Sequence, residues 1–117
     1  MSFLFLIPII KISSLVGIIY IFGGILFYFF RPTKINSIYG YRTTSSMKNQ
    51  ERWGFAQTYA SLKMLESGIW LLLLSLIGFI IHLNIKHELI IGIFLVLFFT
   101  AYLIISTEKA IKRKFKK

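Results

Sequence analysis

Three long apolar stretches without any charged residue dominate this chain. They cover residues 12–30, 67–85 and 89–107. A helix needs roughly 20 residues, at a rise of about 1.5 Å each, to cross a hydrocarbon core about 30 Å thick. The stretches are too long for single strands, and they lack the period-two alternation of a membrane β-barrel. We therefore predict an all-α membrane protein with three transmembrane helices, and a single integral membrane domain over residues 1–117.

Composition supports this class. Hydrophobic residues make up 56% of the chain and the mean hydropathy is +0.74, whereas a soluble domain contains about 45–50% apolar residues. Met1–Ile10 carries no positive charge, and no small-x-small cleavage site precedes Arg31, so we expect this segment to be retained rather than removed as a signal peptide. It would extend the first helix or lie in the interface, with Lys11 reaching the headgroups.

The distribution of charge predicts an orientation. The net charge is +10, from 14 Lys and Arg against 4 acidic residues. Most cations lie in the polar segment 31–66 and in the tail 108–117, whereas the turn after the second span has only Lys86. The positive-inside rule predicts a bacterial cytoplasmic membrane protein with its N-terminus outside and its C-terminus cytoplasmic. Attraction to the anionic cytoplasmic leaflet explains the basic tail, so we expect no nucleic-acid partner.

The sequence offers little to an enzyme. Cysteine and aspartate are absent. Neither paired carboxylates, a nucleophile elbow, a phosphate-binding glycine loop nor an HExxH motif is found. His82 and His87 are five residues apart and fall on different helix faces, which disfavours a zinc site. We therefore expect no catalytic residue, no cofactor and no metal, and we expect Glu66 to pair with Lys63 one turn earlier.

Small residues suggest where the helices touch. Ser13, Gly17 and Gly24 can form one seam on the first helix, and Ser75 lies on the second. Such residues allow close backbone approach in a membrane, where no hydrophobic force draws helices together. We expect packing within one three-helix unit.

The polar segment 31–66 has its own organisation. Pro32 ends the first helix, because the residue before a proline is pushed away from the α region. Tyr39-Gly40-Tyr41 predicts a turn that brings two aromatic rings to the interface. Asn49 can cap a new helix that has Glu51 in its first turn.

An apolar stripe follows that cap. Trp53, Ala56, Ala60 and Met64 share one helix face, and we expect Gln57 and Lys63 to lie away from it. This pattern predicts an amphipathic helix. The helix could lie on the membrane surface or continue into the second span as one rod.

The residues of this segment resemble the signature of the SdpI family. That signature has an N-x-x-x-G-x-R-T stretch, a short polar linker, N-x-x-x-W and then a small residue. Here the matching candidate site residues are Asn36, Tyr39, Gly40, Tyr41, Arg42, Thr43, Asn49, Trp53 and Ala56. The resemblance implies an immunity protein that protects a bacterium against a secreted peptide toxin. It also implies a sensor that holds a transcriptional repressor at the membrane.

Two functions and one structural alternative follow from the resemblance. In the first, the protein binds a peptide toxin in or at the bilayer, and the motif shapes a cytoplasmic cap in which Arg42 is the strongest candidate for a polar contact. In the second, the basic segment 31–66 recruits a cytoplasmic regulator, such as a repressor, to a membrane scaffold. In the third, the motif serves only to lock the fold.

Overall fold

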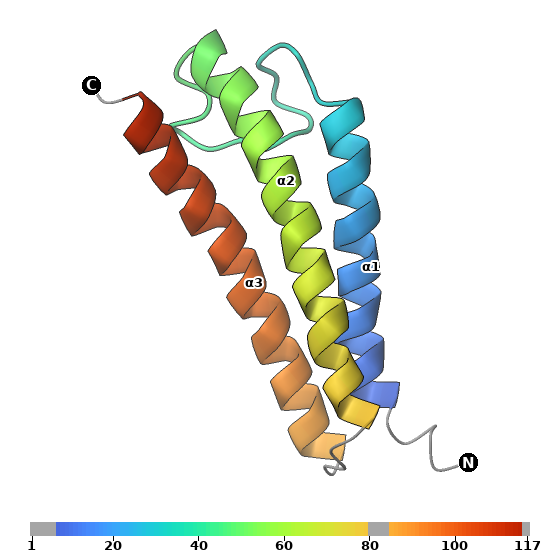
Figure 1. Ribbon diagram of the computed structural model, residues 1–117. Helices are drawn as coiled ribbons and strands as arrows, with labels where there is room; N and C mark the ends of the chain where they lie inside the picture. The colour runs from blue at the N-terminus through green and yellow to red at the C-terminus, as the bar shows by residue number, and fades with distance from the viewer. Residues whose placement is uncertain (1–6, 80–84, 116–117) are drawn as a thin grey trace.

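The computed structural model describes residues 7–79 and 85–115, which form an antiparallel bundle of long helices (Figure 1). The elements in chain order are α1 (Ile7–Phe29), α2 (Gln50–Ser75), the 3₁₀ turn η2 (Leu76–Phe79) and α3 (Ile85–Lys114). No strand occurs within the described residues. The predicted all-α class is confirmed, and the start of α1 at Ile7 shows that the end of the N-terminal segment extends the first helix.

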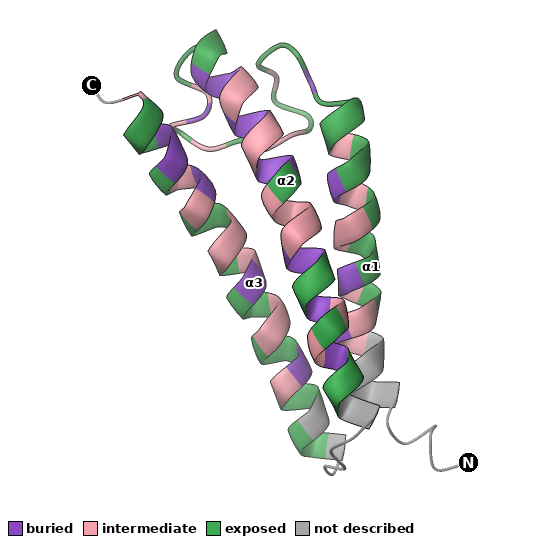
Figure 2. Ribbon diagram, viewed as in Figure 1, coloured by how far each residue is buried: buried purple, intermediate pink, exposed green. Residues whose placement is uncertain are grey.

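Two of these helices have the length and composition to cross a membrane. The apolar stretches are Ile12–Phe29 of α1 and Leu89–Lys114 of α3. Their outward faces are strongly apolar, with Phe22 63% and Phe94 62% exposed (Figure 2). Exposed apolar surface of this extent is typical of contact with lipid rather than water. The 26-residue α2 is long enough but less apolar, so it is not one of these two candidate spans.

α2 joins the amphipathic stripe to the second apolar stretch as one rod. Its first turn is capped by Asn49, whose side chain accepts a hydrogen bond of 2.8 Å from the backbone nitrogen of Arg52. This capping role is confirmed, and it satisfies a backbone donor that the helix itself cannot pair. Of the two arrangements predicted for the amphipathic helix, the structure has the continuous rod.

The second helix ends earlier than the apolar stretch 67–85. Ser75 is the last α-helical residue, and its Oγ donates to the carbonyl of Leu72 at 2.7 Å. The N–H of Leu76 points at three successive carbonyls, which tightens the helix into the 3₁₀ turn. Residues 80–84, including His82 of the predicted outer turn, and the side chain of Lys11 lie outside the described residues.

α3 continues beyond residue 107 into the predicted tail. Within that tail Ala110 and Ile111 are buried, and the carbonyl of Phe115 accepts a hydrogen bond of 2.9 Å from Arg52 of α2. The ring of Phe115 also packs edge-on against Phe55, with 5.8 Å between centroids. Residues 108–114 therefore remain helical because they have α2 to pack against.

Glycines bring α1 and α2 together. A Cβ built on Gly68 would lie 2.6 Å from the carbonyl oxygen of Gly17, and one on Gly24 would lie 2.8 Å from the carbonyl oxygen of Ser61. Ser14 extends the contact by donating to the Oγ of Ser75 at 2.8 Å. The predicted small-residue seam is confirmed for Gly17 and Gly24, and Gly68 is the facing residue that the prediction lacked.

Candidate functional site

The chain between α1 and α2 folds over one end of the bundle and reaches α3 (Figure 1). We call residues 30–49 the motif loop. The matching positions of the signature all fall in this loop or in the first turns of α2. Because the loop has no regular secondary structure, its order depends on side chains that satisfy its backbone.

Trp53 fastens the start of the motif loop to α2. Its side chain is fully buried, and its indole Nε1 donates to the carbonyl of Pro32 at 2.8 Å. Ala56 is also fully buried on the same side of α2. A buried indole N–H needs a partner, and here the partner is the turn by which the chain leaves α1.

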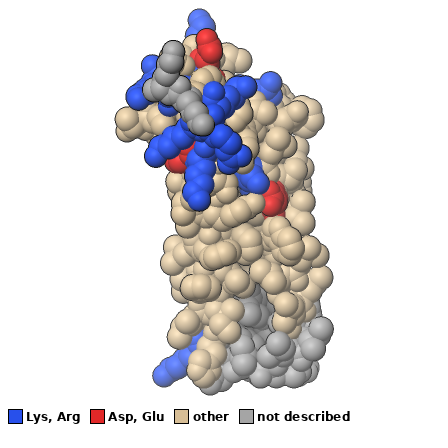
Figure 3. Space-filling view, turned by 60° about the vertical axis from the view of Figure 1, so that its left-hand side comes forward, with Lys and Arg blue, Asp and Glu red and all other residues tan. Residues whose placement is uncertain are grey.

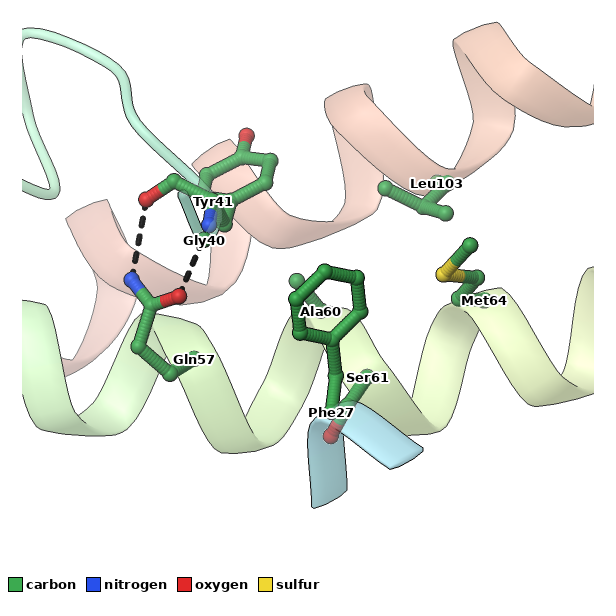
Figure 4. A pocket seen from close by; sticks show the side chains of 8 residues that line it. All are labelled: Phe27, Gly40, Tyr41, Gln57, Ala60, Ser61, Met64 and Leu103. Carbon is green, nitrogen blue, oxygen red and sulfur yellow. Dashed lines mark hydrogen bonds between the residues drawn. The ribbon is translucent and has the colours of Figure 1, made fainter. Parts of the chain in front are cut away.

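Gln57 clamps the backbone of Tyr41 (Figure 4). Its Oε1 accepts from the Tyr41 nitrogen at 2.7 Å, and its Nε2 donates to the Tyr41 carbonyl at 2.9 Å. Burial of the amide is tolerable because both of its ends are paired. The prediction that Gln57 lies away from the apolar stripe is therefore wrong, since its side chain is only 4% exposed.

Gly40 makes this clamp possible. Its φ of +111° is a conformation that residues with a side chain rarely adopt. A Cβ at this position would also lie 2.7 Å from Oε1 of Gln57 and 2.8 Å from Cγ of Pro32. Both the backbone angle and the lack of space therefore require glycine in the Tyr39-Gly40-Tyr41 turn.

Glu108 of α3 is bound by three hydroxyl groups of the motif loop. Its carboxylate accepts from Tyr41 at 2.7 Å, from Thr43 at 2.8 Å and from Ser45 at 2.5 Å. Burial, the hydrogen bond to Glu108 and the charge of Glu108 together raise the pKa of Tyr41, so this phenol stays neutral and acts as a donor. The Tyr41 hydroxyl thus joins the loop to α3. The sequence had predicted only that the ring lies at the membrane interface.

Two further residues, Ser46 and the signature residue Asn36, stabilise the loop by hydrogen bonds within it. The Oγ of Ser46, which is fully buried, donates to the Tyr41 carbonyl at 3.0 Å and accepts from the Thr43 nitrogen at 2.9 Å. The Oδ1 of Asn36 accepts from the nitrogens of Ile38 and Tyr39, each at 2.9 Å. In both cases a side chain forms hydrogen bonds with nearby backbone groups, which takes the place of regular backbone-to-backbone pairing.

Arg42 and Tyr39 remain on the surface. The Arg42 guanidinium donates to the carbonyl of Ser37 at 2.7 Å and is exposed. Tyr39 stacks on Phe27 of α1, with 6.2 Å between ring centroids, and is 46% exposed. Asn49 is exposed as well, but its side chain caps α2, so Arg42 and Tyr39 are the candidate site residues with the most freely presented side chains.

A pocket of about 150 Å³ lies beneath the loop (Figure 4). Gly40 and Tyr41 of the loop line one part of the pocket. The side chains that the three helices contribute are mostly apolar. The lining residues are Phe27, Gly40, Tyr41, Gln57, Ala60, Ser61, Met64 and Leu103. Such a space can take a small apolar group, with the Gln57 amide already occupied by backbone.

A second polar cluster, formed by Lys63, Glu66 and Tyr102, joins α2 to α3. The predicted pair is confirmed, with 3.0 Å between Nζ of Lys63 and Oε1 of Glu66. Tyr102 of α3 accepts from Lys63 at 3.0 Å and donates to Glu66 at 2.8 Å. The hydrogen bonds from Tyr102 and Glu66 raise the pKa of Lys63. Burial alone would raise the pKa of Glu66, but the bonds from Lys63 and Tyr102 lower it, so both groups are charged.

Positively charged side chains gather at the motif-loop end of the bundle, on the face that Figure 3 shows. The exposed cations on the loop and the end of α3 are Arg31, Lys34, Arg42, Lys48, Lys109, Lys112, Arg113 and Lys114. Lys86 lies in the first turn of α3, at the opposite end of that helix. The loop and the end of α3, far apart in the sequence, thus form one basic surface.

Sequence reasoning missed several members of the bonded network. Gln57, Ser45, Ser46 and Glu108 were absent from the predicted site. Gln57 follows Trp53 by four residues, a spacing that places both on one helix face. Glu108 is the only acidic residue in the tail 108–117, which is the signal that could have singled it out.

Known proteins are similar to this chain over the motif loop and the helices that follow it. The model of the SdpI/YfhL protein family matches residues 33–107, which include most of the motif loop, all of α2 and most of α3. The uncharacterized protein YfhL of Bacillus subtilis (strain 168) is 45% identical over 53 residues. That alignment covers 45% of this chain and 48% of YfhL, so the match spans about half the length of the relative. No solved structure matches the chain.

Proposed function

Because the chain belongs to the SdpI/YfhL family, we propose that it is an immunity protein that protects a bacterium against a secreted antimicrobial peptide. The observation that carries the proposal is the family match over residues 33–107, within which the signature forms a folded motif loop. The apolar outer faces of α1 and α3 support residence in the membrane. We propose no catalytic activity and no cofactor.

The proposal includes three membrane spans. α1 and α3 supply two, and the apolar end of α2 with η2 supplies the third. This part of α2 also has an apolar outer face, with Leu73 51% and Leu76 55% exposed. A hydrophobic stretch shorter than the bilayer is accommodated by local thinning of the bilayer, at a modest cost.

The orientation that we propose places the motif loop and the end of α3 in the cytoplasm. The basic surface lies at that end, as the positive-inside rule requires. A secreted peptide would then meet the opposite end of the bundle or the lipid-facing helices first. The motif loop would brace the helices against the peptide or report its binding to the cell interior.

Deletion of the gene tests the proposal. The deletion strain and its parent would be exposed to peptides that the same organism secretes or that neighbouring genes encode, and growth would be followed. We expect one peptide to inhibit the deletion strain at a concentration at least several-fold lower than the parent, and a plasmid copy to restore growth. Equal sensitivity of both strains to every such peptide would contradict the immunity function.

A second function, recruitment of a cytoplasmic regulator, is favoured by the basic surface itself. Its cations project from two segments and stay exposed, which suits an acidic soluble partner. Neutralising Lys112 and Arg113 together would then release the regulator from the membrane fraction while peptide resistance is retained. If resistance is lost and the regulator stays bound, this second function is wrong.

A further inference from the structure

An open apolar groove runs along the last turns of α1, outside the network described above. Its volume is about 310 Å³. The lining residues are Gly23, Leu26, Phe27, Phe30 and Tyr39. Leu26 is 58% and Phe30 71% exposed, so the groove belongs to the outward face of the bundle rather than to its core.

The motif loop builds one wall of this groove. Tyr39 lies over Phe27, and its hydroxyl donates to the carbonyl of Phe30 at 3.4 Å. Gly23, which has no side chain, lines the groove between them, and it also packs closely on α2, because a Cβ there would lie 2.7 Å from the end of Met64. The groove is therefore formed jointly by α1 and the loop residue Tyr39.

Two exposed cations follow the groove residues in the chain. The chain passes directly from Phe30 into Arg31, and Lys34 follows; both are exposed. The Arg31 guanidinium donates to the Tyr28 carbonyl at 2.5 Å and lies 5.5 Å from the centre of the Tyr28 ring. The first 50 residues of the sequence contain no Asp or Glu, so no acidic side chain of this part of the chain neutralises these cations.

We propose that this groove binds one acyl chain of an anionic phospholipid, and that Arg31 and Lys34 hold the lipid phosphate. The apolar stretch Ile12–Phe29 ends just before Arg31, which is where the hydrocarbon core meets the headgroups. An apolar groove along the last turns of α1, with cations directly after it in the chain, matches the two parts of a phospholipid in order. Bound lipid would hold Tyr39, and thus the motif loop, against α1. This inference requires membrane residence but not the immunity function.

Photo-crosslinking in lipid nanodiscs tests this inference. The full-length protein would be labelled with phosphatidylglycerol carrying a diazirine on its acyl chain, and in parallel with phosphatidylcholine of the same chain. We expect phosphatidylglycerol to label the peptide that contains residues 23–30 several-fold more strongly than phosphatidylcholine does. Labelling at equal strength by both lipids, or labelling confined to other helices, would overturn the proposal.

Matched variants separate a specific site from general charge attraction. Replacing both groove cations, Arg31→Gln with Lys34→Gln, should reduce labelling by phosphatidylglycerol to the phosphatidylcholine level. Replacing two other cations at the same end, Lys48→Gln with Lys112→Gln, should leave the preference intact. An exchange that keeps the charge, Arg31→Lys with Lys34→Arg, should retain the preference and shows that the segment still folds. If the two Gln double variants lose the preference for phosphatidylglycerol equally, only net charge matters and the proposed site is wrong.

Discussion

At the motif-loop end of the bundle the helices are joined through hydrogen bonds, whereas in the middle of the bundle α1 and α2 touch through glycines. Gln57 and Glu108 hold the loop to α2 and α3 by five hydrogen bonds between 2.5 and 2.9 Å. Gly17 and Gly68 instead allow direct backbone contact. The motif-loop end depends on matched polar groups, whereas the middle of the bundle depends on the absence of side chains.

The difference reflects the two environments of a membrane protein. Within lipid there is little hydrophobic force between helices, so close packing of small residues supplies the attraction. At the interface, water competes for every donor and acceptor, and an irregular loop is ordered only if its backbone groups are paired. We therefore expect substitutions in the glycine contact to act on assembly of the bundle, and substitutions at the loop to act locally.

The largest effect is expected for Gly68→Leu. The new side chain would collide with the backbone of α1, since even a Cβ would lie 2.6 Å from Gly17 O and 2.8 Å from the nitrogen of Ile21. Overpacking typically costs about 1–3 kcal/mol and occasionally more, and backbone has little room to adjust. Denaturation in detergent micelles, followed by circular dichroism, should show a loss of at least this size.

Gly54→Ala is the control for that substitution. Nothing lies within 4 Å of a Cβ built on Gly54, and alanine is favoured over glycine in a helix by up to about 1 kcal/mol. We expect this variant to be more stable than the parent. A loss in Gly54→Ala similar to that in Gly68→Leu would show that α2 resists any glycine replacement, and that the α1 contact is not the cause.

Gln57→Leu should destabilise the protein by about 1–3 kcal/mol, the cost of leaving a buried backbone donor unpaired. The nitrogen of Tyr41 loses its partner, while the Tyr41 carbonyl keeps the hydrogen bond from Ser46. The matched control is Gln50→Leu, because Gln50 is exposed and binds the Thr33 carbonyl. Thermal unfolding should separate the two variants, and equal stability would mean that the clamp does not hold the loop.

Glu108→Gln should have a smaller and local effect. The loop hydroxyls would meet a neutral amide, and hydrogen bonds to charged groups exceed neutral ones by about 1 kcal/mol. Hydrogen exchange at residues 41–46 should then accelerate roughly fivefold, with exchange at the Gly17–Gly68 contact unchanged. Glu51→Gln, an exposed acid at the start of α2, is the control. Faster exchange throughout α1 and α2 would contradict a local role for Glu108.

These two regions also differ in how far the sequence could predict them. The long charge-free stretches and the Asn49 cap predicted helices near their observed places, because helix length and capping depend on nearby residues. The seam on α1 could be read from Gly17 and Gly24 for the same reason. The facing residue Gly68 could not be predicted, because which residue of α2 faces the seam depends on how the two helices are aligned.

The loop network was harder to predict because its bonds join distant parts of the chain. Glu108 binds residues more than 60 positions earlier in the sequence, and no local pattern records such a pairing. Gln57 was misplaced because a polar side chain normally faces water. Here the backbone nitrogen and carbonyl of Tyr41 take the place of water as hydrogen-bond partners of Gln57. They reach Gln57 only when the loop is folded.

The smallest effect on stability, and the sharpest test of function, is expected for Arg42→Gln. Its guanidinium is exposed and bonds to the Ser37 carbonyl of the same loop, so the change should alter the unfolding free energy by less than about 0.5 kcal/mol. If Arg42 contacts a partner, peptide resistance should nevertheless fall at least several-fold with the amount of protein in the membrane unchanged. Lys48→Gln removes one exposed charge from the same loop and should leave resistance intact. Full resistance in Arg42→Gln would mean that the arginine, unlike the buried Trp53 and Gln57, serves neither the fold nor the partner. An equal fall in Lys48→Gln would assign the effect to net charge.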